Sequence, residues 1–214
     1  MALGVEIVAV VSHSYKIATE LKKALVSEKK ARKELKVEIE AMQERIAADK
    51  AERKLFRELT RGSESKLKKK LDTYRMKRIA LRQKLESLSI TLDDLLASGV
   101  ALKGTPNSEK AQKAIEESVN QLLVVIGAKN KARNEGGVLI ERGYKVVEEA
   151  KLKRTHGTVG NAELGRRAVA AMGKAYEALA VVVDPMDELI DKSIELGVKA
   201  GAAAVKEVKK LKLK

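Results

Sequence analysis

Apolar residues recur at helical spacing along most of the first 96 residues, from about Ser14 to Leu96. A heptad frame over the first half of this stretch has apolar a and d positions at Ala18, Leu21, Leu25, Leu35, Ile39, Met42, Ile46 and Phe56. Polar residues interrupt that seam at Glu28, Arg32, Asp49, Arg53 and Thr60. The second half has a more regular seam, at Leu67, Leu71, Tyr74, Arg78, Leu81, Leu85, Leu88, Leu92 and Leu95. The pattern predicts two long amphipathic helices.

The two predicted helices are separated near Gly62. Gly62 can end the first helix, and Ser63 can cap the second. Residues 1–97 are therefore predicted to form a long antiparallel helical hairpin of coiled-coil type, about 50 Å long at ~1.5 Å per residue. One continuous helix paired with another chain is the alternative, since a helix interior tolerates a glycine at a cost of about 1 kcal/mol. The first dozen residues fit either a helix or a short strand.

Helix-breaking residues mark a boundary at residues 98–108, where Gly104, Pro106 and Ser108 predict a linker. Apolar stripes beyond it predict four helices in residues 109–214, ending in a basic tail. The last of these helices is expected to begin at Asp184-Pro185, with Asp184 as N-cap and Pro185 in the first turn. The predicted fold class is all-α, a long helical hairpin followed by a small helical bundle.

The composition agrees with packed helices, because aromatic residues make up only 2% of the chain and hydrophobic residues 44%. The abundance of charged residues and the scarcity of Asn and Gln are typical of heat-adapted proteins, and also of charged helical proteins in general. No apolar run reaches the roughly 18 residues of a membrane span. The first residues lack the basic start of a signal peptide. We expect a soluble chain, intracellular or within a nucleoprotein particle.

Residues that carry chemistry are few. Cysteine is absent, which excludes disulfides and thiolate metal sites. The two histidines, His13 and His156, stand outside any metal-binding or acid–base motif. The glycine-bearing stretch 155–160 lacks the lysine of a phosphate-binding loop. We expect a non-enzymatic protein with neither a cofactor nor a bound metal.

The formal net charge is +14, and much of it is local. Residues 61–85 contain ten cations against two carboxylates. In the heptad frame, the e positions are Lys68, Arg75 and Arg82, and the g positions are Lys70, Lys77 and Lys84. A hairpin that turns near Gly62 should bring Lys70 to Glu52, Lys77 to Arg45 and Lys84 to Glu38. Its e edge should face cations of the first helix, among them Lys22, Lys29 and Lys36.

Such an edge would repel itself by a few tenths of a kcal/mol per pair, which a polyanion would offset. The main hypothesis is a self-associating structural protein that binds the backbone of DNA or RNA without sequence preference, as chromatin or virion proteins do. The predicted phosphate-binding residues are Lys68, Lys70, Arg75, Lys77, Arg82 and Lys84, aided by Lys22, Lys29 and Lys36.

Other readings of the basic edge remain open. A coiled-coil scaffold or adaptor would dock it on an acidic protein partner. The edge could also be solvated, or covered by acidic residues of the same chain or a neighbour, such as Asp184, Asp187, Glu188, Asp191 and Glu195. Attachment to an anionic membrane is a third function, disfavoured because Trp and Phe are missing beside the lysines.

Overall fold

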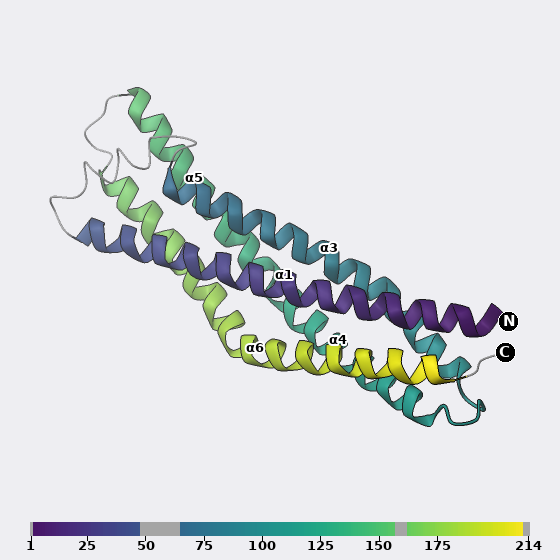
Figure 1. The fold of residues 1–214 in the computed structure, drawn as a ribbon. Helices are drawn as coiled ribbons and strands as arrows, with labels where there is room; N and C mark the ends of the chain where they lie inside the picture. Colours follow the sequence, from purple (N-terminus) through teal and green to yellow (C-terminus); the bar gives the residue numbers. More distant parts are fainter. Residues whose placement is uncertain (1, 48–64, 157–161, 212–214) are drawn as a thin grey trace. The chain divides into compact units, whose positions relative to one another are not determined.

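The computed structural model describes residues 2–47, 65–156 and 162–211, and these residues form helices and no strand (Figure 1). The helices are α1 (Ala2–Ala47), α3 (Lys66–Ala101), α4 (Glu109–Lys131), α5 (Arg133–His156) and α6 (Ala162–Lys210). The predicted all-α class is confirmed, and residues 2–12 belong to α1. The predicted turn near Gly62 lies outside the described residues.

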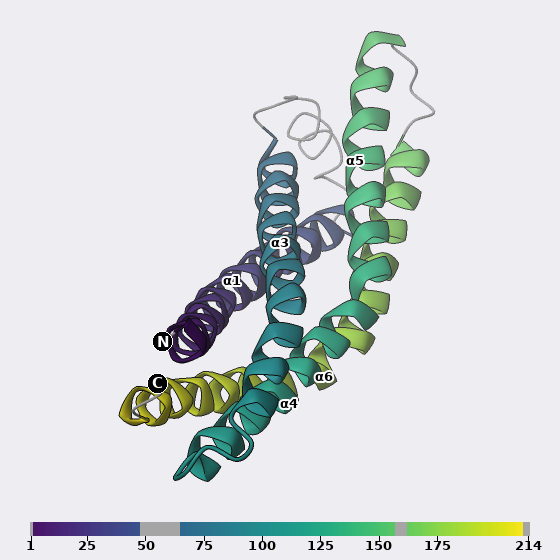
Figure 2. The same cartoon turned by 90° about the vertical axis from the view of Figure 1, so that its right-hand side faces the viewer.

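The chain divides into two compact units that do not follow the order of the sequence. Unit 1 combines Met1–Val26, Ala80–Asn130 and Pro185–Lys214, whereas unit 2 combines Ser27–Ile79 and Lys131–Asp184. α1, α3 and α6 each contribute to both units because they are 46, 36 and 49 residues long. This division differs from the predicted one at residues 98–108. That stretch contains the turn between α3 and α4, within unit 1 (Figure 2).

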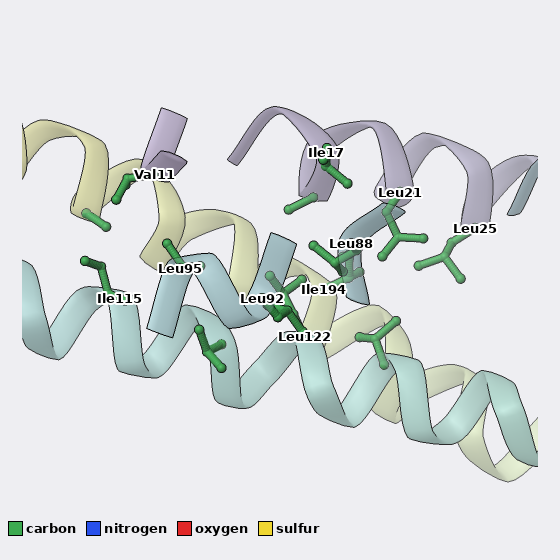
Figure 3. Close-up of a cluster of buried hydrophobic side chains, with 14 of the residues drawn as sticks. Val11, Ile17, Leu21, Leu25, Leu88, Leu92, Leu95, Ile115, Leu122 and Ile194 are labelled. Atoms are coloured by element: carbon green, nitrogen blue, oxygen red, sulfur yellow. The ribbon is translucent and has the colours of Figure 1, made fainter. Parts of the chain in front are cut away.

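The core of unit 1 is aliphatic and draws on α1, α3, α4 and α6 (Figure 3). Its buried side chains include Val11, Leu21, Leu25, Leu88, Leu92, Leu95, Ile115, Leu122 and Ile194. Small residues of α6 allow close packing here. A Cβ atom on Gly197 would lie 3.1 Å from the Leu122 side chain, and the Ser118 hydroxyl donates a hydrogen bond to the Gly197 carbonyl at 3.0 Å. α4 and α6 therefore pack closely at Gly197, which leaves little room for a side chain there.

The core of unit 2 is formed by α1, α3, α5 and α6. It buries Leu35, Ile39, Met42, Leu67, Leu71, Tyr74, Leu139, Val146, Val169, Met172 and Leu179. The predicted seams of the first two helices are thus buried wherever their side chains are described, apart from Arg78 and Leu85, which are half-buried. The polar interruptions Glu28 and Arg32 are buried as well.

The expected helix start at Asp184-Pro185 is wrong, because α6 runs through Pro185. Asp184 does not cap a helix but accepts a hydrogen bond from Arg32 Nη1 at 3.1 Å. Proline removes one backbone hydrogen bond inside a helix. Burial compensates for that loss, since α6 places Val183 in one core and Ile190 in the other. The local start signal is therefore overridden by packing on both sides of it.

Candidate nucleic-acid-binding surface

Two lysines of α3 bridge to glutamates of α1, in a register different from the predicted one. In unit 2, Lys70 Nζ lies 2.5 Å from Glu34 Oε2. In unit 1, Lys84 forms an ion pair with Glu20. Hydrogen bonds from these lysines hold the pKa values of Glu34 and Glu20 below their usual range.

The predicted pairing of Lys84 with Glu38 is wrong, since Glu20 lies eighteen residues earlier on the chain. Lys70 likewise has Glu34 as its partner, while Glu52 lies outside the described residues, as does the side chain of Arg45. A shift of eighteen residues is five helical turns at about 3.6 residues per turn. The same apolar stripe then still faces the neighbouring helix, so periodicity could not distinguish the two registers.

Of the three g positions of α3, Lys77 has no carboxylate of the described residues opposite it. It is exposed, and it forms no ion pair with any residue in the described part of the chain. Lys77 follows Lys70 by seven residues, and the same step back from Glu34 leads to Ser27. Among the described residues, no carboxylate therefore pairs with the ammonium group of Lys77.

Two e positions of α3 lie against α5 rather than α1. Lys68 Nζ donates a hydrogen bond to Asp72 Oδ2 at 2.6 Å, and this bond raises the pKa of Lys68. Asp72 also accepts a hydrogen bond from the Tyr144 hydroxyl at 2.5 Å. Arg75 is exposed and places its guanidinium 5.9 Å from the centre of the Tyr144 ring. This part of the predicted edge is a contact between α3 and α5.

The remaining predicted cations also have neighbours within the chain. Arg82 pairs with Glu86 at 2.6 Å, and Lys36 with Glu40 at 3.7 Å. Lys29 is half-buried and interacts with another residue.

Lys22, on α1 in unit 1, is exposed and lies near Glu195 of α6. A hydrogen bond from Lys199 lowers the pKa of Glu195, and the charge of Lys22 lowers it further. Glu195 was named above among the acidic residues that could cover the basic edge. Tyr144 follows the predicted linker at 98–108, and it was missed because only the first two helices were considered for the edge.

The positive charge is concentrated in unit 2 when it is counted over the folded units. Unit 2 contains 28 Lys and Arg residues against 17 Asp and Glu residues, a net charge of +11. Unit 1 contains 16 against 13, a net charge of +3. The positive charge of this protein is thus concentrated in one unit that is assembled from distant segments. It is not confined to the single stretch 61–85.

Several exposed cations of unit 2 form no ion pair with another described residue. They are Lys30, Lys33, Lys66, Lys69, Lys77, Lys131, Arg133, Arg142 and Lys174. Three of these surround the bridge between Lys70 and Glu34. Lys66 lies one turn before Lys70, and Lys77 lies two turns after it. Lys30 lies one turn before Glu34, and the charge of Lys30 helps to lower the pKa of Glu34. Sequence reasoning missed Lys30 and Lys66 because neither occupies an e or g position that faces another cation.

Aromatic side chains contribute no exposed ring among the described residues. Tyr74 and Tyr176 are buried, and burial together with the charge of Glu28 raises the pKa of Tyr74. Tyr15 and Tyr144 are half-buried. The described surface therefore has no platform on which unpaired bases could stack.

Neither a metal site nor a membrane span is found in the described ranges. No three His, Asp or Glu side chains there are arranged to hold a metal ion. None of the described helices combines the length and the apolar character needed to cross a bilayer. Comparison of the chain with protein-family models, curated proteins and solved structures finds no match.

Proposed function

We propose that this protein is a non-enzymatic structural protein that binds the phosphate backbone of nucleic acid through unit 2. The observation that carries the proposal is the net charge of +11 on that unit, against +3 on unit 1. Lysine and arginine side chains that neutralise phosphates release condensed counterions, which drives binding without sequence preference. A surface with excess positive charge is what this kind of binding requires.

The central contacts are assigned to Lys30, Lys66 and Lys77 because these side chains are exposed and form no ion pair with another described residue. Lys70 and Lys84 are already bound to glutamates of α1, and Lys68 and Arg82 to carboxylates of α3. Each of these paired lysines and arginines would exchange one anion for another, which gains less. Lys77 is thus the strongest member of the predicted set.

A duplex suits this surface better than an unpaired strand. Readers of single strands stack bases on exposed aromatic rings, and the described part of the chain exposes none. Contacts from rigid helices to regularly spaced phosphates need no such rings. The proposed partner is therefore double-stranded DNA or RNA, bound by its backbone.

The test is binding to random duplexes across a salt series. The variant Lys30→Gln/Lys66→Gln/Lys77→Gln should reduce the slope of log affinity against log salt by about two to three units, at roughly 0.9 per phosphate on duplex DNA. The matched control Lys16→Gln/Lys23→Gln/Lys113→Gln removes three exposed cations from unit 1, and it should leave the slope nearly unchanged. Failure of the wild type to bind at about 50 mM salt, where this attraction is strong, would refute the proposal and leave an acidic protein partner as the alternative.

A further inference from the structure

The two ends of α3 carry opposite charge. Residues 66–84 contain nine Lys and Arg residues against Asp72 alone, whereas residues 85–101 contain Glu86, Asp93 and Asp94 and no cation. This order opposes the helix dipole, which favours anions at the N-terminus and cations at the C-terminus. The first turn of α3 has no acidic residue and the last turn no basic one. Intrahelical electrostatics therefore do not explain the pattern.

The solvent-facing side of α3 carries a stripe of exposed residues that includes large apolar side chains. We name Lys69, Met76, Gln83, Ile90 and Asp94 the outer stripe. Met76 is 63% exposed and Ile90 is 72% exposed. The positions between them, Thr73, Ala80 and Ser87, are also exposed and have small side chains. Because α3 is one continuous helix, the alignment of these residues follows from helix geometry alone.

We propose that the outer stripe binds the outer stripe of a second copy of this chain in antiparallel orientation, about a two-fold axis. One register places Lys69 of each copy opposite Asp94 of the other. The same register places Met76 opposite Ser87, and Ala80 opposite Gln83. The charges are then complementary at both ends, and small side chains at the centre allow the helices to approach.

Charge complementarity selects both the occupant and its direction. In a parallel pair, Lys69 would face Lys69 and Asp94 would face Asp94, which costs free energy. In the antiparallel pair, each acidic end of α3 meets a basic end, and the pairing closes as a dimer because the same patch serves both copies. The carboxylates also offset the unfavourable position of the lysines on the helix dipole.

This inference does not rest on the proposed function. The outer stripe uses Lys69, whereas the proposed phosphate contacts are Lys30, Lys66 and Lys77, of which Lys66 lies one turn before Lys69 on the same helix. A protein that fails to bind nucleic acid could still form this dimer, and a protein that forms it could fail to bind.

Charge reversal tests the pairing by sedimentation equilibrium at low salt. The wild type should be dimeric. Lys69→Asp and Asp94→Lys should each weaken the dimer by at least tenfold, because each places like charges opposite one another at both ends. The double variant Lys69→Asp/Asp94→Lys should restore it, since the charges are then exchanged. Circular dichroism checks that every variant stays helical. A monomeric wild type, or a double variant no tighter than the single variants, would overturn the proposal.

Crosslinking tests the direction, and the absence of native cysteine makes single-cysteine variants unambiguous. In the proposed register, the two Gln83 positions are offset by only three residues, about 4.5 Å along the axis. The two Ala97 positions are about 46 Å apart. A short bismaleimide should therefore link copies of Gln83→Cys and not copies of Ala97→Cys. A crosslink at Ala97, or none at Gln83, would overturn the antiparallel register.

Discussion

The Tyr144 hydroxyl of α5 donates a hydrogen bond to Asp72 Oδ1 of α3 at 2.5 Å. Lys68 binds the other oxygen of the same carboxylate. Tyr144→Phe removes the bond to α5 and leaves the bond to Lys68. The expected loss of unfolding free energy is about 0.5–1 kcal/mol, below the ~1.5–3 kcal/mol usual for a bond to a charged group, because Asp72 is partly solvated. Urea unfolding at neutral pH measures it, and an unchanged midpoint would contradict a stabilising role.

The stabilising effect of the Asp72 carboxylate should depend on pH. Partial burial raises its pKa, but hydrogen bonds from Lys68 and Tyr144 outweigh this, and the pKa lies below its usual value. A depressed folded pKa gives stability that is complete above the unfolded pKa of about 3.9 and is lost as the pH falls through the folded pKa. The gap in unfolding free energy between wild type and Asp72→Asn should therefore be constant above about pH 5 and shrink below about pH 4. A gap that persists undiminished at about pH 2 would refute this assignment.

Gly143 of α5 faces Leu71, a fully buried residue of α3. A Cβ atom there would lie 2.5 Å from Leu71 Cδ2, too close for contact without movement. We expect Gly143→Ala to lower the melting temperature, because overpacking costs about 1–3 kcal/mol and exceeds the gain of about 1 kcal/mol in helix propensity. Gly137→Ala is the matched control in the same helix, since no atom lies within 4 Å of its added Cβ. That variant should raise the melting temperature.

Arg32 is 2% exposed and forms an ion pair with Asp184. Arg32 and Glu28 both lie near Tyr74, because the charge of each affects the pKa of the tyrosine. Arg32→Leu leaves the buried carboxylate of Glu28 with less compensation. We expect a loss of roughly 2–4 kcal/mol in unfolding free energy. Glu28→Leu/Arg32→Leu should recover most of it, because no buried charge is then left behind. Additive losses in the double variant would show that the two charges do not depend on each other.

Ser27→Glu should create a further bridge from α1 to α3. Its position relative to Lys77 repeats that of Glu34 relative to Lys70. A small rise in melting temperature is expected, and Lys77→Gln should abolish it. The same substitution should weaken duplex binding under the proposed function, because it occupies Lys77. Stabilisation that survives in the Lys77→Gln background would rule out this register for Ser27.

Periodicity predicted the helices well and their partners poorly. Leu67, Leu71 and Leu88 are buried as the heptad frame required, because the frame depends only on which face of a helix is apolar. The register between α1 and α3 was missed because a shift by five turns preserves that face. Local capping rules also failed at Asp184-Pro185, where a core on each side outweighs the start signal.

The presence of a cationic surface could be predicted from the sequence, but the identity of its unpaired residues was harder to predict. Composition and local charge indicated a cationic surface, and Lys77, one of the predicted phosphate-binding residues, is exposed and forms no ion pair with another described residue. The partners of Lys70, Lys84 and Arg75 depend on contacts that join segments far apart in the chain. Counting charges along the sequence cannot show which cations those contacts neutralise.

The division into two units has a consequence for how the chain folds during synthesis. Each core contains side chains from α1, near one end of the chain, and from α6, near the other. Neither core can therefore close while α6 is still being translated, in contrast to a protein whose domains follow one another along the sequence. A nascent chain that still lacks α6 would expose the apolar side chains of α1, α3, α4 and α5 that line the two cores. Both cores of a nascent chain therefore stay incomplete until α6 has emerged.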